Sequence, residues 1–348
     1  MQAILPPAML GILGGGQLGR MFVTAAKRMG YRVTVLDPDA QAPAAEFADV
    51  HLCAAYNDAE ALRTLAASCA AITTEFENVN ADAMRELAKT TRVSPSGDCV
   101  AIAQDRIAEK AWVNKAGLPT APYLSIESVE DIQVELAPYL PGILKTARLG
   151  YDGKGQVRVN SADEARAAYA NLGGHACVLE KMLDLKLEVS AIVTRVSPEQ
   201  LSVFPVAENI HKNGILDESI VPARIAPALA AQAQQMARQL AEALDYVGVL
   251  AVEFFVLADD SLVINEIAPR PHNSGHYTID ACVSDQYQQQ VRAMCGLLPG
   301  RTDLLSPVVM VNLLGDVWQA DGGEPNWNVL MEAPNAHQIG RASCRERV

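Results

Sequence analysis

The sequence predicts a mixed fold in which an α/β unit with a parallel sheet comes first and an α+β unit follows. Over the first 97 residues, short apolar strands alternate with helical patterns, which is typical of a parallel sheet. A glycine-rich turn at 150–156 follows an apolar strand, and two further apolar strands, 251–257 and 262–267, flank a short polar turn. The last two features are typical of antiparallel hairpins.

Composition excludes several classes of protein. The chain has 348 residues, more than one ordinary domain of about 100 to 200, so we expect two or three packed units. A net charge of −13 argues against binding to nucleic acid or to an anionic membrane surface. No run reaches the ~18 apolar residues of a membrane helix, and the start lacks a signal-peptide pattern, so we expect a cytoplasmic protein. The seven scattered cysteines are expected to be reduced core thiols.

The first strand and helix are joined by a glycine-rich turn. Residues 9–13 read as a buried strand, 14–20 as the turn into a helix that runs to about Met29, and 32–37 as a second strand that ends in an acid. This satisfies G-x-G-x-x-G with its acidic partner, which is the dinucleotide-binding fingerprint. NAD binding is therefore one reading, and a helix N-terminus that faces another anion is the other.

The parallel sheet continues to residue 74. A strand ending near Cys53, a helix at 58–69 and a strand at 70–74 extend it, and Glu75 follows at the carboxyl end, where open α/β sheets bind ligands. An exposed acidic loop is the alternative reading of this position. Pro/Gly-rich turns at 94–97 and 117–122 flank one predicted helix, Asp98 to Ala116, and mark a domain boundary.

The turn at 150–156 has the composition of a polyphosphate-binding loop. Three glycines with a lysine between two of them present backbone N–H groups and one mobile cation, while Lys145 lies in the preceding apolar strand. A flexible turn and a lysine that reaches solvent are the alternatives. We expect the loop in a small α+β unit with a helix at 162–172 and a strand at 176–180, which could move as a lid.

Two acids are expected to face each other in the second hairpin. Strands at 188–193 and 203–208, a turn at 212–214 and a helix at 226–244 precede it. A two-residue turn at Asp259-Asp260 would place Glu253 opposite Glu266, with Cβ atoms about 5 Å apart. Such a pair needs a proton or a cation, and oxygen ligands suit Mg²⁺. A loop of odd length would break this pairing, and an exposed acidic pair is the alternative. The predicted neighbours on the same face are apolar: Phe255, Leu257, Leu262 and Ile264.

These motifs occur in the order of the ATP-grasp fold, preceded by a Rossmann-like sheet. The run 265–276, together with 150–156, 14–20 and 245–249, closely resembles the N5-carboxyaminoimidazole ribonucleotide synthetase family of de novo purine synthesis, over about residues 8–338. The resemblance implies that ATP activates bicarbonate and that the amine of 5-aminoimidazole ribonucleotide captures the carboxyl group. It also implies Mg²⁺, a homodimer, and a glycine turn at 14–19 that serves substrate and not nicotinamide.

The resemblance implies a set of site residues. Those expected to contact ATP are Arg106, Lys145, Gly150, Tyr151, Asp152, Gly153, Lys154, Gly155, Gln156, Glu180, Lys181, Met182, Leu183, Glu188, His211, Asn265 and Glu266. Those expected to bind the ribonucleotide are Gln17, Leu18, Glu75, Tyr151 and Asp152. Glu253 and Glu266 would hold magnesium, and Arg270, His272 and Asn273 would hold bicarbonate during phosphoryl transfer. Taken alone, His211 has a structural histidine as its alternative reading.

We expect five segments: a Rossmann-like substrate domain at 1–97, a linker helix at 98–121, a small lid subdomain at 122–184, a large subdomain at 185–338, and a tail at 339–348. The tail departs from the family pattern and has three arginines in its last eight residues, so we interpret it as foreign sequence and expect ATP binding to survive better than carboxylation. The alternatives are a relative that activates formate or another carboxylate, and a nucleotide-binding remnant inactivated by this ending.

Overall fold

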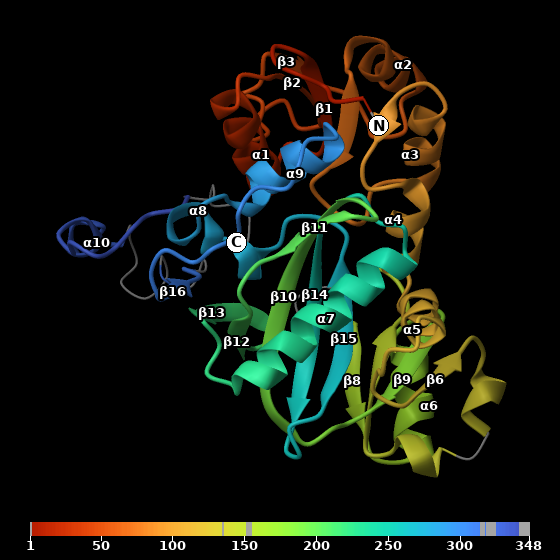
Figure 1. Ribbon diagram of the computed structural model, residues 1–348. Coiled ribbons are helices and arrows are strands. Elements are labelled where there is room, and N and C mark those ends of the chain that lie inside the picture. Colours follow the sequence, from red (N-terminus) through yellow and green to blue (C-terminus); the bar gives the residue numbers. More distant parts are fainter. Residues whose placement is uncertain (1, 134–135, 151–154, 314–316, 318–324, 341–348) are drawn as a thin grey trace.

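The computed structural model describes residues 2–133, 136–150, 155–313, 317 and 325–340. Within these ranges the chain forms three sheets (Figure 1). The mixed α/β and α+β architecture predicted from the sequence is therefore confirmed. No helix in this part of the chain is long and apolar enough to cross a membrane. Of the predicted tail, residues 341–348 lie outside the described ranges, and Ile339 packs against the core.

The N-terminal sheet is parallel, with strand order β3-β2-β1-β4-β5. Its elements are β1 (Met9–Leu13), α1 (Gln17–Arg28), β2 (Arg32–Leu36), β3 (Val50–Leu52), α2 (Ala59–Ser68), β4 (Ala71–Thr74), α3 (Ala81–Ala88) and β5 (Arg92–Val93). Separate apolar clusters form around α1 and around the pair α2 and α3, because the strands are buried on both faces. This arrangement sets the carboxyl ends of β1 and β4 side by side, with Glu75 directly after β4.

The predicted single helix from Asp98 to Ala116 is wrong. The chain instead forms α4 (Gly97–Ala103) and α5 (Arg106–Lys115). The break occurs because Asp105 is an extended N-cap whose carboxylate accepts hydrogen bonds from the N–H groups of Ile107 and Ala108. The Arg106 N–H donates to the carbonyl of Ala147 at 2.9 Å, which fixes the start of α5 against the small sheet.

The small sheet is antiparallel, with order β6-β9-β7-β8. Its elements are β6 (Tyr123–Ile126), η1 (Val129–Gln133), η2 (Ala137–Tyr139), β7 (Gly142–Thr146), β8 (Gln156–Val159), α6 (Ala162–Asn171) and β9 (Cys177–Lys181). One face of this sheet packs on α6 in its own apolar cluster. The sheet lies beside the β15 side of the large sheet (Figure 1), and the segment just before β6 is joined to β15 by a bridge between Thr120 and Ile264.

The large sheet has the order β15-β14-β10-β12-β13-β16, with β11 paired to β10. Its strands are β10 (Leu185–Ser197), β11 (Gln200–Val203), β12 (Ala207–Lys212), β13 (Ile215–Val221), β14 (Gly248–Leu257), β15 (Leu262–Ala268) and β16 (Val308–Val311). Helix α7 (Pro227–Ala243) covers one face. The predicted continuous strand 203–208 is wrong, because Pro205 has no N–H for a ladder and the strand is interrupted at 204–206; β11 and β12 on either side both pair antiparallel with β10.

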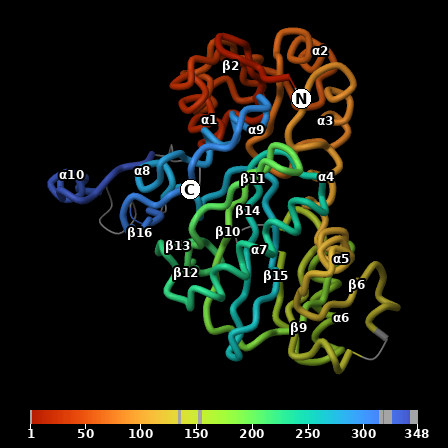
Figure 2. The backbone as a smooth tube through the Cα atoms, viewed as in Figure 1, coloured from red at the N-terminus to blue at the C-terminus, as the bar shows by residue number. Residues whose placement is uncertain are grey.

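A return segment ties the large sheet to the N-terminal sheet. It contains η3 (Asn273–Gly275), α8 (Thr278–Ala281) and α9 (Gln286–Met294), and α10 (Asn328–Met331) follows β16. Both backbone views place α9 beside α1 (Figures 1 and 2). Within α9, the Gln290 amide oxygen accepts from the Val249 N–H at 2.7 Å, and its NH₂ donates to Thr73 Oγ1 at 2.9 Å and to the Ser94 carbonyl at 3.2 Å. Gln290 thus bridges the two sheets.

Replacing Gln290 with alanine should lower the free energy of unfolding by about 1 to 3 kcal/mol, because the buried Val249 N–H loses its partner. Chemical denaturation with circular dichroism measures this. Gln288→Ala, on a half-buried position of the same helix, is the matched control and should change stability by less than about 0.5 kcal/mol. Equal effects of the two substitutions would contradict the bridging role.

Candidate active site

The β14–β15 hairpin places Glu253 directly opposite Glu266, as predicted. The predicted two-residue turn is wrong, however. Val256 pairs with Leu262, and the intervening five-residue loop has Asp260 at a positive φ of 63°. A bulge at Asn265, between the pairs Glu253–Glu266 and Phe254–Ile264, offsets this odd loop and restores the carboxylate pairing.

The same bulge changes which side chains accompany the two acids. Leu262 and Ile264 were expected on the acidic face, but they pair with Val256 and Phe254 and are buried in the cluster under α7. Phe255 remains on the face of Glu253 and pairs with Val263. The carboxylates therefore have fewer apolar neighbours on β15 than the sequence predicts.

The two carboxylates differ in environment. Glu253 is 8% exposed, and burial together with the nearby Glu266 carboxylate raises its pKa to about 8. The Glu266 side chain is 46% exposed. Among the described residues, no group of three or more His, Cys, Asp or Glu side chains could hold a metal ion unaided. Two carboxylates that compete for one proton suit a cation whose other ligands come from phosphate and water, as is typical of Mg²⁺.

Cationic side chains converge beside this pair. The Arg106 guanidinium donates to the carbonyls of Thr146 and Gly150 at 3.2 and 3.0 Å, and its Nη2 lies 3.9 Å from Glu266 Oε2. Lys145 Nζ lies 3.1 Å from Glu180 Oε2. Arg106 comes from α5 and Lys145 from β7, so the helix break at Asp105 and the small sheet together bring positive charge to the acidic hairpin.

The glycine loop is held at both ends, while Tyr151, Asp152, Gly153 and Lys154 lie outside the described residues. Gly150 accepts a hydrogen bond from Arg106 at one end. At the other end, the Gly155 carbonyl accepts from the Thr146 N–H at 2.8 Å, and Gln156 pairs with Lys145. Gly155 has φ 71°, and a Cβ there would lie 2.7 Å from Thr146 Oγ1, so this position requires glycine.

The segment after β9 lies between the two subdomains. The Glu180 side chain is 5% exposed and is engaged by lysines. The N–H groups of Lys181 and Met182 donate to the carbonyls of Pro122 and Pro141 at 2.8 and 2.9 Å, and Leu183 follows directly. Hydrogen bonds within the small subdomain thus already use part of the predicted adenine-binding backbone.

Glu188 and His211 form a pair on the large sheet. His211 Nδ1 lies 3.1 Å from Glu188 Oε2, between the neighbouring strands β12 and β10. Burial disfavours the charged imidazole, but the Glu188 carboxylate outweighs it, so the pKa of His211 is above its usual value. These two predicted nucleotide residues are therefore adjacent to each other, and Glu188 lies on β10, the strand next to β14, which carries Glu253.

The residues predicted to hold bicarbonate follow β15. The Nε–H of Arg270 donates to Glu77 Oε2 at 2.5 Å, and although burial opposes ionisation, Arg270 lowers the pKa of Glu77 to about 2. Burial and Arg270 lower the pKa of His272 to about 3, so its imidazole is neutral. His272 Nδ1 accepts from the Ser274 N–H, which places the ring proton on Nε2, 3.6 Å from Glu253 Oε1.

Buried Asn273 Oδ1 has no hydrogen-bond partner among the described residues, so an acceptor is available beside Arg270 and His272.

The predicted ribonucleotide residues lie at the carboxyl edge of the parallel sheet. The Glu75 carboxylate accepts hydrogen bonds from the N–H groups of Gly16 and Gly19. Gln17 and Leu18 form the first turn of α1. Because the Glu75 carboxylate already accepts hydrogen bonds at this helix N-terminus, these N–H groups are not available to bind a pyrophosphate. Asp37, the acid of the fingerprint, is 7% exposed and accepts from the Gly15 N–H and the Tyr56 hydroxyl at 2.7 and 2.6 Å, so it is not available to a nicotinamide ribose.

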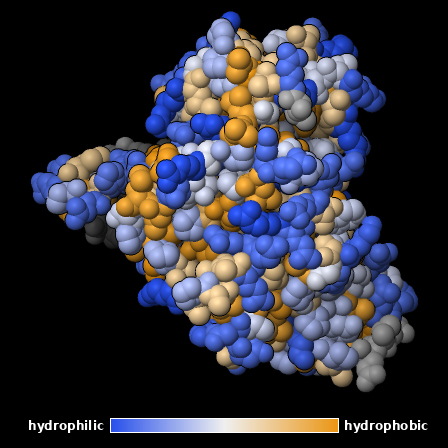
Figure 3. Space-filling view, in the orientation of Figure 1, coloured by the Kyte–Doolittle hydropathy of each residue, from blue (hydrophilic) through white to orange (hydrophobic). Residues whose placement is uncertain are grey.

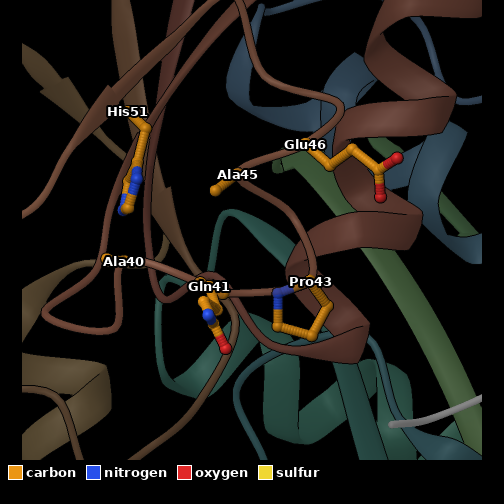
Figure 4. Close-up of a pocket in the computed structure, with 7 residues that line it drawn as sticks. Ala40, Gln41, Pro43, Ala45, Glu46 and His51 are labelled. Atoms are coloured by element: carbon orange, nitrogen blue, oxygen red, sulfur yellow. The ribbon is translucent and has the colours of Figure 1, made fainter.

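A separate hollow of about 450 Å³ lies beyond β2 (Figure 4). Its walls are formed by Ala40, Gln41, Ala42, Pro43, Ala45, Glu46 and His51. His51 Nε2 lies 3.1 Å from the Asp37 carbonyl, so its ring already has a partner. None of the predicted site residues lines this hollow, and it shows no convergence of charged groups.

Three residues of the site were missed by sequence reasoning. Lys110 lies one helical turn after Arg106 and its Nζ is 3.2 Å from Glu180 Oε1. Its neighbour Glu109 is buried and accepts from the Ile267 N–H at 2.8 Å. Glu77 holds Arg270. Two signals in the sequence could have identified two of them. Lys110 lies four residues after Arg106 on one helix face, and Glu77 lies in the acidic loop after β4.

Two family models match the chain: an ATP-grasp domain over residues 111–287 and a ribonucleotide synthetase preATP-grasp domain over residues 8–104. The chain is 46% identical over 316 residues to the N5-carboxyaminoimidazole ribonucleotide synthase of Bacillus subtilis, covering 90% of this chain and 83% of that protein. It is 47% identical over 317 residues to the enzyme of the same name from Brucella melitensis, covering 90% and 88%.

Solved structures of similar proteins agree with this. An ADP complex of N5-carboxyaminoimidazole ribonucleotide synthetase superimposes with a TM-score of 0.90 at 44% identity, covering 100% of this chain and 92% of that one. The Aspergillus clavatus enzyme in complex with ADP and 5-aminoimidazole ribonucleotide superimposes with a TM-score of 0.84 at 30% identity, covering 96% and 92%.

The buried Glu109 carboxyl should make stability depend on pH. Burial, followed by the Glu266 charge, raises its pKa from 4.5 to about 8. Between these values the folded chain retains a proton that the unfolded chain releases, so stability falls as the pH rises. Glu109→Gln keeps the acceptor for the Ile267 N–H and removes the titration. The difference in unfolding free energy, Glu109→Gln minus the unmodified chain, should increase by more than about 1 kcal/mol between pH 5 and pH 8.

Denaturant unfolding at the two pH values measures this difference. Glu242→Gln, at an exposed position on α7, is the control and should show no such trend. A constant difference between Glu109→Gln and the unmodified chain would mean that Glu109 is ionised in the folded state.

Proposed function

The chain belongs to the N5-carboxyaminoimidazole ribonucleotide synthase family of ATP-grasp ligases, and we propose that its site performs the carboxylation with Mg²⁺-ATP and bicarbonate. It is an ATP-dependent ligase of purine biosynthesis whose substrate is 5-aminoimidazole ribonucleotide. The observation that carries the proposal is the pairing of Glu253 with Glu266 beside Arg106, with Lys145 linked to the same hairpin through Glu180 and Lys110. This arrangement has the ligands for a divalent cation and the charges for a polyphosphate at one place.

Glu253 and Glu266 are the proposed magnesium ligands, with Asn265 beside them. The raised pKa of Glu253 supports this assignment, because a cation would relieve the repulsion that now favours a proton. Bound Mg²⁺ would neutralise charge on the phosphates during transfer. Arg106, Lys145 and the loop Gly150–Gln156 are proposed to bind the β- and γ-phosphates, where fixed donors stabilise charge that develops in the transition state.

The adenosine half of ATP is proposed to bind along Glu180–Leu183, Glu188 and His211. Since lysines occupy the Glu180 carboxylate, its contribution to adenine is expected through the backbone of this segment. Glu188 is proposed to accept from the ribose hydroxyls. The neighbouring His211, whose pKa Glu188 raises, would add a donor close to the nucleotide.

Arg270, His272 and Asn273 are proposed to hold bicarbonate. The guanidinium, fixed by Glu77, supplies positive charge, and the neutral His272 supplies an Nε2–H donor. The unpartnered Asn273 Oδ1 suits the one hydroxyl of bicarbonate. A bicarbonate oxygen would attack the γ-phosphorus and ADP would leave. The amine of 5-aminoimidazole ribonucleotide would then attack the carboxyl carbon, with release of phosphate and of the amine proton.

The ribonucleotide is proposed to bind at the carboxyl edge of β1 and β4, near Gln17, Leu18 and Glu75, with Tyr151 and Asp152 from the loop. A carboxylate at the start of α1 would repel a phosphate there. The amine or the ribose hydroxyls are therefore the parts expected to face Glu75.

The segment boundaries and a homodimer complete the proposal. The substrate domain is 1–97, the linker 98–121, the lid 122–184 and the large subdomain 185–338, with the tail at 339–348. Hydrophobic residues gather on the surface beside β16 (Figure 3), where Val309 and Val311 are 53% and 54% exposed. An exposed apolar edge strand of this kind favours association.

ADP release should require both co-substrates. With Mg²⁺-ATP, the purified chain should release ADP at a rate that rises at least about tenfold only when bicarbonate and 5-aminoimidazole ribonucleotide are both present, because the phosphoryl transfer needs its acceptor in place. A coupled ADP assay measures the rate.

Formate in place of bicarbonate is the control and should give no stimulation. Stimulation by formate would favour the related carboxylate-activating ligase. ATP binding without stimulation by either anion would favour the nucleotide-binding remnant.

Arg270→Lys should selectively weaken bicarbonate use. Lysine keeps a charge near Glu77 but loses the planar fork, so kcat/KM for bicarbonate should fall at least about tenfold. The affinity for ATP should stay within about twofold, since Arg270 is not expected to contact the nucleotide. Arg301→Lys, an exposed arginine paired with Asp303, is the control. An equal loss for ATP and bicarbonate would contradict the assignment.

A further inference from the structure

Lys110 is a buried cation without an assigned role in the reaction. It projects from α5, is 2% exposed, and its Nζ lies 3.2 Å from Glu180 Oε1 and 3.5 Å from the Asn265 carbonyl. The other oxygen of the same carboxylate, Glu180 Oε2, lies 3.1 Å from Lys145 Nζ. One buried carboxylate therefore joins two lysines that come from different elements, α5 and β7.

The charges of this triad do not cancel. Burial opposes ionisation of Glu180, but Lys145 and Lys110 outweigh it and the pKa of Glu180 is lowered, so the carboxylate is ionised. Two ammonium groups and one carboxylate leave a net charge of +1. Without Lys110, the remaining Lys145–Glu180 pair would be neutral. The Lys145 side chain, at 13% exposed, is the more accessible of the two lysines.

We infer that Lys110 is a positioning residue for ATP: it neutralises Glu180 through one carboxylate oxygen, so that Lys145 keeps a net positive charge to offer the nucleotide phosphates. This inference rests on the proposed function, in which Lys145 binds phosphate. The contact of Lys110 with the Asn265 carbonyl also links the small sheet to the strand that carries Glu266. Lys110 would thereby fix the distance between the phosphate-binding lysine and the metal ligands.

A purely structural role makes a different prediction. A lysine that only joins α5 to the two sheets would affect stability, and its loss would not be repaired by changing the charge at position 180. If Lys110 acts by neutralising Glu180, removing the charges of both Lys110 and Glu180 leaves only the positive charge of Lys145. The net charge of the triad is then the same as in the unmodified chain.

The test compares Lys110→Met with the double variant K110M/E180Q in the full chain. KM for ATP should rise at least about tenfold in Lys110→Met, while KM for 5-aminoimidazole ribonucleotide stays within about twofold. In the double variant, KM for ATP should return to within about threefold of the unmodified chain. Lys115→Met, an exposed lysine of the same helix over the Trp112 ring, is the matched control and should leave both constants unchanged.

The inference is overturned if the double variant is as impaired for ATP as Lys110→Met, or if both KM values rise together. Should Lys110→Met fail to fold, the double variant decides alone: a KM for ATP near that of the unmodified chain supports the inference, and a tenfold rise overturns it. If the unmodified chain does not turn over, calorimetric ATP binding by the same variants replaces KM, with the same pattern expected. The binding measurement therefore distinguishes a failure of the inference from a failure of the proposed function.

Discussion

The repulsion between Glu253 and Glu266 is the constraint on which the site depends. The hairpin pairs them across neighbouring strands, and burial of one makes two charges at this place costly. Neighbouring cations and hydrogen-bond donors reduce the free-energy cost of this repulsion. Arg106 approaches Glu266, the imidazole of His272 faces Glu253, and further cations follow from the small sheet. A proton relieves this repulsion, and in the proposed function a divalent cation with a polyphosphate would relieve it as well.

Helix α5 connects this constraint to the rest of the fold. Within one turn it supplies Arg106 to the loop and to Glu266, Glu109 to the backbone of β15, and Lys110 to Glu180. The N-cap at Asp105 sets its direction. The small sheet and the large sheet thus meet around this short helix. A movement of the small sheet relative to β15 would have to carry or break these contacts.

Local patterns in the sequence predict much of this, and long-range contacts account for what they miss. The apolar runs predict the two strands, and an assumed two-residue turn predicts the opposition of Glu253 and Glu266. The structure keeps that opposition through a longer odd loop and a compensating bulge at Asn265, and neither of these has a signature in the pattern. The break at Asp105 carries an N-cap signal that the prediction of one helix between two Pro/Gly-rich turns did not use. Nothing in the local sequence pairs Lys110 with Glu180, because partners 70 residues apart are brought together only by the fold.

The most direct test of the account measures ATP affinity by calorimetry with and without Mg²⁺, in the unmodified chain and in Glu253→Gln. In the unmodified chain Mg²⁺ should tighten ATP binding at least about tenfold, because Glu253 and Glu266 would hold the cation and the cation would neutralise charge on the phosphates. Glu253→Gln should lose most of that gain while binding metal-free ATP as well as before. An equal response to Mg²⁺ in the two proteins would contradict the claim that the paired carboxylates form the metal site.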